Sequence, residues 1–198
     1  MNKIFTKAAL AASISLFAFN ATALESADVQ ASVTVQNAFT FTNDAGLNFG
    51  TIRATADPAG TTTATIVMPA NPSADPVATD GTNASIAELV RGERALFSVS
   101  GVAPFGTLTL DSSGITGEVN AVTAPPGTPK FTIGTPTFWL LTGGAGTGAA
   151  ITGGTLQVDA TGAATFNMGA TLTTDAAVTT SAYIDGEYRG TFALTLDY

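Results

Sequence analysis

The chain has 198 residues with no cysteine and no histidine, and 15 acidic residues against 7 basic ones give it a net charge of −8. Without a basic patch it is not expected to bind nucleic acid, and without cysteine it cannot depend on disulfides. Catalysis that needs a histidine base or a cysteine nucleophile is excluded, so we expect neither an enzyme nor a bound cofactor or metal.

Residues 1–23 have the three parts of a secretory signal peptide. Lys3 and Lys7 give a positive start, residues 8–19 form an apolar run, and Ala21-Thr22-Ala23 is a small-residue cleavage site. The run is too short to cross a bilayer as a helix. We therefore expect the chain to be exported, with Leu24 as its first mature residue.

Residues 24–36 hold a short polar leader and an alternating segment. Side chains alternate between the two faces of a strand, so one face would carry Val29, Ala31, Val33 and Val35. A strand of this kind has unpaired backbone groups until another strand pairs with it. Two interpretations stay open: it is the first strand of its own domain, or it leaves that domain and completes the sheet of another copy.

Residues 37–198 predict one all-β domain, because glycine and proline interrupt short strand-like segments throughout. Such a pattern favours an antiparallel sandwich or barrel. We expect strands within 39–41, 47–52, 61–68, 95–101, 107–122 and 130–141. Residues 69–83 predict a loop rich in Pro, Asp and Gly, and residues 85–90 fit either a helical turn or a strand.

Residues 155–174 predict a hairpin around the turn Asp159-Ala160-Thr161-Gly162. The glycine-rich residues 143–148 lack the lysine of a phosphate-binding loop and predict a turn. Asp185 and Glu187 flank Gly186 and are interpreted as a solvated turn rather than a glycosidase pair. A lone tryptophan in a β-domain, here Trp139, is typically a core residue.

The last residues of the sequence form the clearest alternating stretch. One side of this predicted strand carries Tyr188, Gly190, Phe192, Leu194, Leu196 and Tyr198. The other side carries Arg189, Thr191 and three further polar or small residues. The pattern predicts one long strand at the edge of a sheet, and such an edge needs a partner.

Three stretches carry a resemblance to a known family: LQVDATGAATFNMGATLTT, YIDGEYRGTFALTLDY and ASVTVQNAFTFTNDAGLNFGTI. They resemble the secreted bacterial family called domain of unknown function 4402. That family is similar in layout to archaic chaperone–usher pilins and spore-coat-U-like proteins. The resemblance implies an immunoglobulin-like, pilin-like β-sandwich that assembles with copies of itself, helped by a periplasmic chaperone and an outer-membrane usher.

The resemblance also implies roles for the two ends of the mature chain. Val29, Ala31, Val33 and Val35 match the face of a donor strand. The final strand matches the strand that bounds the acceptor groove, and a chaperone would hold it before assembly. Its matching residues are Gly190, Phe192, Leu194, Leu196 and Tyr198.

The expected function is that of an exported structural subunit that assembles on the cell surface by β-strand addition, as a pilus or a coat. One alternative is a stand-alone surface binding module or adhesin that uses Trp139 or the loops. Another is a small outer-membrane β-barrel, although one Trp and three Tyr are few for two aromatic girdles.

Overall fold

The computed structural model describes residues 27–33, 38–176 and 182–198. The chain divides into residues 1–36 and residues 37–198, which are treated separately below. The predicted signal peptide and Val35 lie outside the described residues. Residues 27–33 belong to no strand, and the side chains of Val29 and Val33 are exposed.

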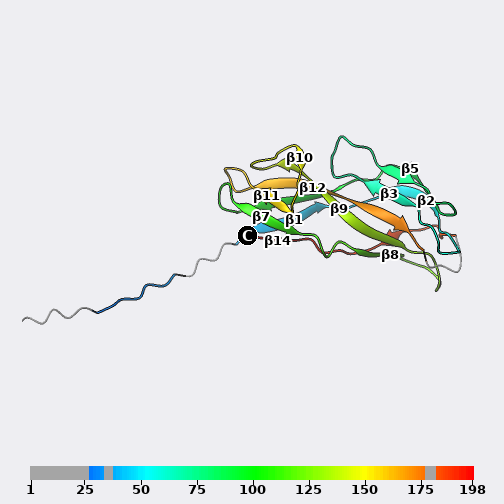
Figure 1. Ribbon diagram of the computed structural model, residues 1–198, viewed down its shortest axis with the longest axis horizontal. Coiled ribbons are helices and arrows are strands. Elements are labelled where there is room, and N and C mark those ends of the chain that lie inside the picture. The colour runs from blue at the N-terminus through cyan, green and yellow to red at the C-terminus, as the bar shows by residue number, and fades with distance from the viewer. Residues whose placement is uncertain (1–26, 34–37, 177–181) are drawn as a thin grey trace, which may run out of the picture. The chain divides into compact units, whose positions relative to one another are not determined.

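Residues 38–198, as far as they are described, form an all-β antiparallel sandwich, which confirms the predicted fold class (Figure 1). The larger sheet has the strand order β1 (Thr40–Ala45), β6 (Ala95–Ser100), β12 (Ala164–Thr174), β9 (Phe131–Thr142), β8 (Gly117–Ala121) and β13 (Tyr188–Arg189). Three further strands extend this sheet: β3 (Thr65–Met68) on β12, β4 (Val77–Thr79) on β3, and β10 (Ala149–Ala150) on β9.

Two smaller sheets complete the sandwich. One has the order β11 (Thr155–Gln157), β7 (Thr107–Asp111) and β14 (Thr195–Asp197), and the other pairs β2 (Thr51–Thr55) with β5 (Ser85–Val90). The described residues contain no apolar helix of a length that could cross a membrane.

The larger core cluster contains an aromatic stack formed by residues of β1, β6 and β12. The ring centroids of Phe97 and Phe166 lie 5.3 Å apart, and the ring of Phe41 lies 5.5 Å from Phe97 and 6.2 Å from Phe166. Phe166 is completely buried. Leu108 and Val158 pack against this stack from the smaller sheet, because alternate residues of each strand face inward.

The predicted hairpin at residues 155–174 is wrong in its pairing, although its turn is present. Gly162 N–H donates to the carbonyl of Asp159 at 3.1 Å, but β11 pairs with β7 while β12 pairs with β3, β6 and β9. Leu156 and Phe166 both belong to the same core cluster. The two arms therefore separate into different sheets, which bury their apolar faces against each other across the core.

Three other segments refine the predictions from sequence. The predicted loop at 69–83 contains the short strand β4, in which Val77 pairs with Val67 of β3, and residues 85–90 form a strand. Strand β9 continues through Pro136, where Thr135 and Pro136 lie opposite Ala170 alone in a bulge that accommodates the proline. The glycine-rich residues 143–148 form the turn between β9 and β10, as predicted.

Asp57 organises the turn before β3. Its side chain is almost completely buried and accepts hydrogen bonds from the hydroxyl of Thr61 at 2.7 Å, from that of Thr62 at 3.0 Å, and from the backbone N–H groups of Ala59, Thr61 and Thr62. These hydrogen bonds, first of all that of the Thr61 hydroxyl, hold the pKa of Asp57 well below its usual range.

We expect Asp57→Asn to lower the melting temperature at neutral pH. The melting temperature of the variant should also change less than that of the wild type as the pH is lowered. The folded-state pKa of Asp57 lies below the ordinary value of 3.8, so its contribution is present above that pH and is lost as the pH falls toward the folded-state pKa. Melting temperatures from circular dichroism between neutral pH and pH ~2 test this. Asp185→Asn, at an exposed turn, is the matched control, and equal acid profiles for Asp57→Asn and the wild type would contradict the expectation.

Candidate functional site

A groove of about 1270 Å³ runs along the sandwich. It exceeds the ~300–1,000 Å³ of ordinary small-molecule pockets. Residues of β1 and β2 line one side, and residues 183–194 line the other. Its floor is hydrophobic core, and it includes Phe97, Phe131, Ile133, Met168 and Leu172.

The first wall of the groove is the edge of the larger sheet. Strand β1 pairs with β6 along one side, with Phe41 opposite Val99, and no described strand pairs with its other side. Phe41 is only partly buried and faces the groove from above the aromatic stack. The edge therefore combines free backbone groups with an aromatic side chain that remains partly open to solvent.

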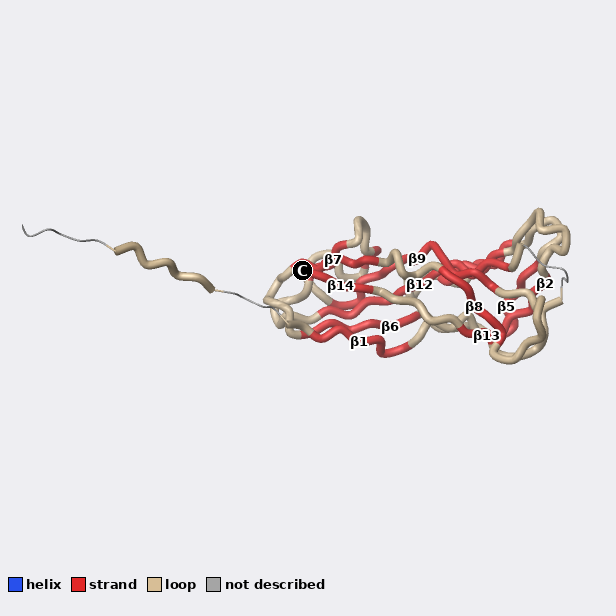
Figure 2. The backbone as a smooth tube through the Cα atoms, turned by 90° about the horizontal axis from the view of Figure 1, so that it is seen from below, coloured by secondary structure: helices blue, strands red, loops and turns tan. Residues whose placement is uncertain are grey.

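The second wall is the C-terminal segment, of which Figure 2 shows the stretch between β13 and β14 as a loop. Instead of one long strand it forms β13, five residues outside any strand, and β14. Ala193 N–H donates to the carbonyl of Gly114 at 3.3 Å, on the side away from the groove. N–H groups alternate in direction along an extended chain, so in an extended conformation those of Phe192 and Leu194 would be available to a strand in the groove.

Gly190 is required in this wall by a close approach to β8. A Cβ at this position would lie 2.7 Å from the carbonyl oxygen of Glu118 and 2.7 Å from the ring of Phe192. Any larger residue would push the segment away from β8 and into the groove. The predicted alternation is visible in burial, since Phe192 and Leu194 are partly buried while Thr191 and Ala193 are exposed.

One end of the groove is closed by an aromatic contact between the two walls. The ring of Phe39, just before β1, lies edge-on to that of Tyr198 with centroids 5.5 Å apart, and the Tyr198 hydroxyl accepts a hydrogen bond from Ala103 N–H at 3.3 Å. The groove lining ends before this contact, at Phe41 and Leu194. Because the start of β1 meets the end of β14, the two walls run antiparallel.

At the other end of the groove, an isolated β-bridge between Thr55 and Ala182 joins the two walls, and a second aromatic group packs beside it. Tyr183 stacks on Phe131 with centroids 4.3 Å apart, and its hydroxyl donates to the carbonyl of Lys130 at 2.9 Å and accepts from Asp175 N–H at 2.8 Å. Tyr188 packs edge-on against Phe131 at 5.2 Å. Burial raises the pKa of both tyrosines, so both are neutral at physiological pH.

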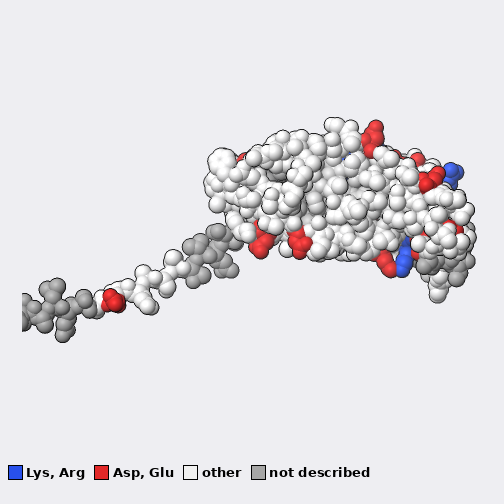
Figure 3. Space-filling view, viewed as in Figure 1, with Lys and Arg blue, Asp and Glu red and all other residues white. Residues whose placement is uncertain are grey.

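Charge is sparse around the groove. Arg189 pairs with Glu187 at 2.7 Å, and Arg53 on β2 has no ion pair among the described residues. Figure 3 shows only scattered charged side chains, mostly acidic, on the visible face of the sandwich. A mainly apolar groove between backbone edges suits an extended, apolar peptide segment better than a charged ligand.

The predicted residues of the final strand divide into two groups. Gly190, Phe192 and Leu194 line the groove. Leu196 is buried in the core, and Tyr198 contacts Phe39 at the closed end. Of the predicted donor face, Val29, Ala31 and Val33 are described and exposed, and Val35 lies outside the described residues.

The opposite wall was missed by the sequence analysis. Phe41, Leu47 and Phe49 line the groove, yet they were expected only as ordinary strand residues. The alternation of Phe39 and Phe41 gave a signal for a strand but none for which of its edges is free. Free edges depend on how distant strands pair, and that is not encoded in local alternation.

The structure also places the other residues that the sequence analysis considered. Asp185 and Glu187 are exposed around Gly186, and Glu187 is engaged with Arg189. Trp139 is half-buried rather than a core residue, whereas its neighbour Leu140 is buried. Within the described ranges, no group of three or more acidic side chains is placed to hold a metal ion.

Comparison of the chain with models of protein families, with curated proteins and with solved structures finds no match.

Proposed function

We propose that the protein is an exported structural subunit that assembles by β-strand addition: residues 24–36 of one copy occupy the groove of the next. The observation that carries this proposal is the groove itself, which lies between the edge of the larger sheet and the C-terminal segment and has hydrophobic core as its floor. A strand inserted there would pair with β1 and with the C-terminal segment at the same time.

The donor segment has the pattern that such a groove requires. Seven residues from Val29 to Val35 span roughly 23 Å when extended. Val29, Ala31, Val33 and Val35 would face the core, and full burial of each valine is worth about 1.5–3 kcal/mol. Ser32 and the other alternate residues would face outward. Backbone hydrogen bonds to Phe192 and Leu194 would add to the apolar contacts.

The two ends of the groove differ in how they are closed. The Phe39 and Tyr198 rings meet at the near end, whereas the single β-bridge between Thr55 and Ala182 spans the far end. The donor segment continues directly into its own domain at Phe39, so the junction between tail and domain has to leave the groove. In the proposed assembly it leaves at the far end, so the donor runs with Val35 near Tyr188, parallel to β1 and antiparallel to the C-terminal segment.

An exposed apolar groove also explains why a chaperone and an usher would be needed during assembly. An apolar groove left open in the periplasm would favour aggregation. A periplasmic chaperone that lends a strand to the final edge would protect it until another copy replaces that strand, and an outer-membrane usher would organise the exchange. Both partners follow from the resemblance to archaic chaperone–usher pilins.

The proposal is tested by removing residues 24–36 while the signal peptide is kept. We expect a folded protein that forms no polymer, whereas the intact chain gives a ladder on an unboiled denaturing gel that collapses to one band on boiling. A synthetic peptide of residues 24–36 should raise the melting temperature of the shortened protein by occupying its groove. A peptide of the same composition in scrambled order is the matched control.

A polymer that still forms without residues 24–36 would overturn the donor role. A single soluble band from the intact chain, unchanged by boiling, would instead favour the stand-alone binding module or adhesin. A single band that stays with the membrane and shifts in position on boiling would favour an outer-membrane barrel.

A further inference from the structure

Phe105 is held in an unfavourable conformation and exposed to solvent. Its φ angle is +58°, in the left-handed region that bulky residues rarely adopt, and 58% of the residue remains accessible. Strained backbone of this kind persists where the surrounding structure enforces it, and it is concentrated at functional positions. An exposed apolar ring on a strained backbone is therefore a candidate for contact with another protein.

The surrounding loop fixes Phe105 through its backbone. The N–H of Phe105 donates to the carbonyl of Asp159 at 3.0 Å, and its carbonyl accepts from Gln157 Nε2 at 3.0 Å. Val102 N–H donates to the carbonyl of Gly162 at 3.2 Å. These hydrogen bonds join the loop between β6 and β7 to the turn before β12 and fix the backbone from which the Phe105 ring projects.

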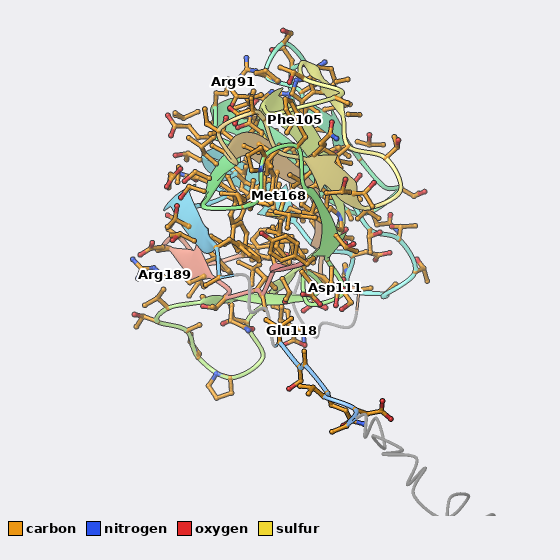
Figure 4. All side chains as sticks on the ribbon, turned by 90° about the vertical axis from the view of Figure 1, so that its left-hand side faces the viewer. Arg91, Phe105, Asp111, Glu118, Met168 and Arg189 are labelled. Atoms are coloured by element: carbon orange, nitrogen blue, oxygen red, sulfur yellow. The ribbon has the colours of Figure 1, made fainter. Side chains whose placement is uncertain are left out.

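Phe105 lies at the end of the sandwich where the donor tail is attached. The same loop contacts this end twice: Ala103 N–H donates to the Tyr198 hydroxyl, and Gly101 lies beside the backbone of Phe39. Figure 4 views the sandwich from this end and labels Phe105. Any protein that receives the tail is therefore brought close to this end, because only a few residues separate the tail from Phe39.

A second, smaller hollow lies at the opposite end of the sandwich. Its volume is about 370 Å³, and its lining mixes the apolar Ala121, Val122 and Ile184 with Thr123, Asp185, Gly186 and Glu187. Residues 184–187 line both this hollow and the large groove, so the hollow adjoins the far end of the groove, where the proposed donor segment would leave it. Val122 is 57% exposed, an apolar side chain without a described covering.

We propose that Phe105 of each copy packs into the hollow beside Val122 and Ile184 of the copy that receives its tail. This junction rests on the proposed strand exchange and its direction, because a tail that leaves the groove near Tyr188 brings these two surfaces together. The contact joins different patches of identical subunits, so it repeats head to tail along the polymer. It would fix the angle between neighbouring subunits, which the tail alone would leave free.

The chain has no cysteine, so a disulfide pair can report this junction without background. Full-length chains carrying Phe105→Cys with Val122→Cys would be assembled, oxidised, boiled and run without reductant. A parallel arm would use a short bis-maleimide, which tolerates a longer separation than the ~3.5–4.5 Å between Cβ atoms of a disulfide. We expect a covalent ladder that survives boiling and, in the oxidised arm, collapses on reduction.

Matched controls separate this junction from chance contacts and from the effect of losing the ring. Val77→Cys with Val122→Cys uses a residue of equal exposure, 58%, on β4, and should give no ladder above that of the single-cysteine variants. Phe105→Asn should leave the domain folded, since asparagine tolerates the left-handed region. Its polymers should form but show a shorter persistence length in electron micrographs than those of Val77→Asn.

Polymers that assemble normally, but in which the Phe105 and Val122 positions do not cross-link above the Val77 control in either arm, would overturn the junction while leaving strand exchange intact. Equal stiffness of the Phe105→Asn and Val77→Asn polymers would count against it in the same way. Absence of any boil-sensitive ladder, in the wild type as well, would overturn strand exchange and the junction together.

Discussion

Val33→Asp is expected to abolish polymer formation while the sandwich remains folded. Val33 lies in the middle of the apolar donor face, and its insertion into the groove would carry a carboxylate onto a floor of Phe97, Met168 and other core residues. Burial of an unpaired charge costs far more than the about 1.5–3 kcal/mol that a buried valine contributes. Sedimentation and unboiled denaturing gels should show monomer only, with a far-ultraviolet spectrum equal to that of monomeric wild type.

The neighbouring residue gives a matched control for this experiment. Ser32→Asp introduces the same charge one position earlier, on the face of the strand that points away from the groove. Its polymers should resemble the wild type. Equal loss of assembly in the two variants would mean that charge in the tail, rather than burial of one face, prevents polymerisation. Normal assembly of Val33→Asp would contradict the predicted donor face.

Phe166→Ala should have the largest effect on the stability of the domain itself. Phe166 is completely buried in the stack with Phe41 and Phe97 and also packs edge-on against Phe138 at 6.2 Å. Truncation of a buried phenylalanine to alanine costs about 3–5 kcal/mol, because apolar contacts are lost and a cavity remains. Urea unfolding of the monomeric fraction, followed by circular dichroism, measures the change in the free energy of unfolding.

Phe166→Leu serves as the graded control for this substitution, because it keeps much of the buried volume. Its loss of stability should be clearly smaller than that of Phe166→Ala. If the two variants unfolded at the same urea concentration as the wild type, the stack would not be the centre of the core. Assembly should follow stability here, since Phe166 supports Phe41 and Phe97, which line the groove.

Local patterns in the sequence were sufficient for the fold class. Alternation predicted the strands around Leu96, Leu108 and Phe166, and glycine and proline predicted most of the turns. The alternation of the C-terminal segment also identified three residues of the groove wall, Gly190, Phe192 and Leu194. These successes concern which face of a segment is buried, a property that depends on neighbouring residues along the chain.

Pairing between distant segments could not be predicted in the same way. The turn at Asp159 suggested a hairpin, but Leu156 and Phe166 are better buried in opposing sheets than side by side in one. The wall formed by Phe41 became recognisable only once β1 was seen at the edge of its sheet. Likewise, the sequence around Phe105 does not predict its strained and exposed conformation, because hydrogen bonds to residues more than fifty positions away hold it there.

In the proposed assembly, a tail that enters every groove with Val29 toward the contact between Phe39 and Tyr198 would give a chain of subunits a polarity. Each added copy would face the same way, so one terminus of the assembly would carry an unused tail and the other an unused groove. A copy without residues 24–36 would still receive a tail but would donate none. Small amounts of such a copy, mixed with intact protein, would act as terminators, and average length would be set by the mixing ratio.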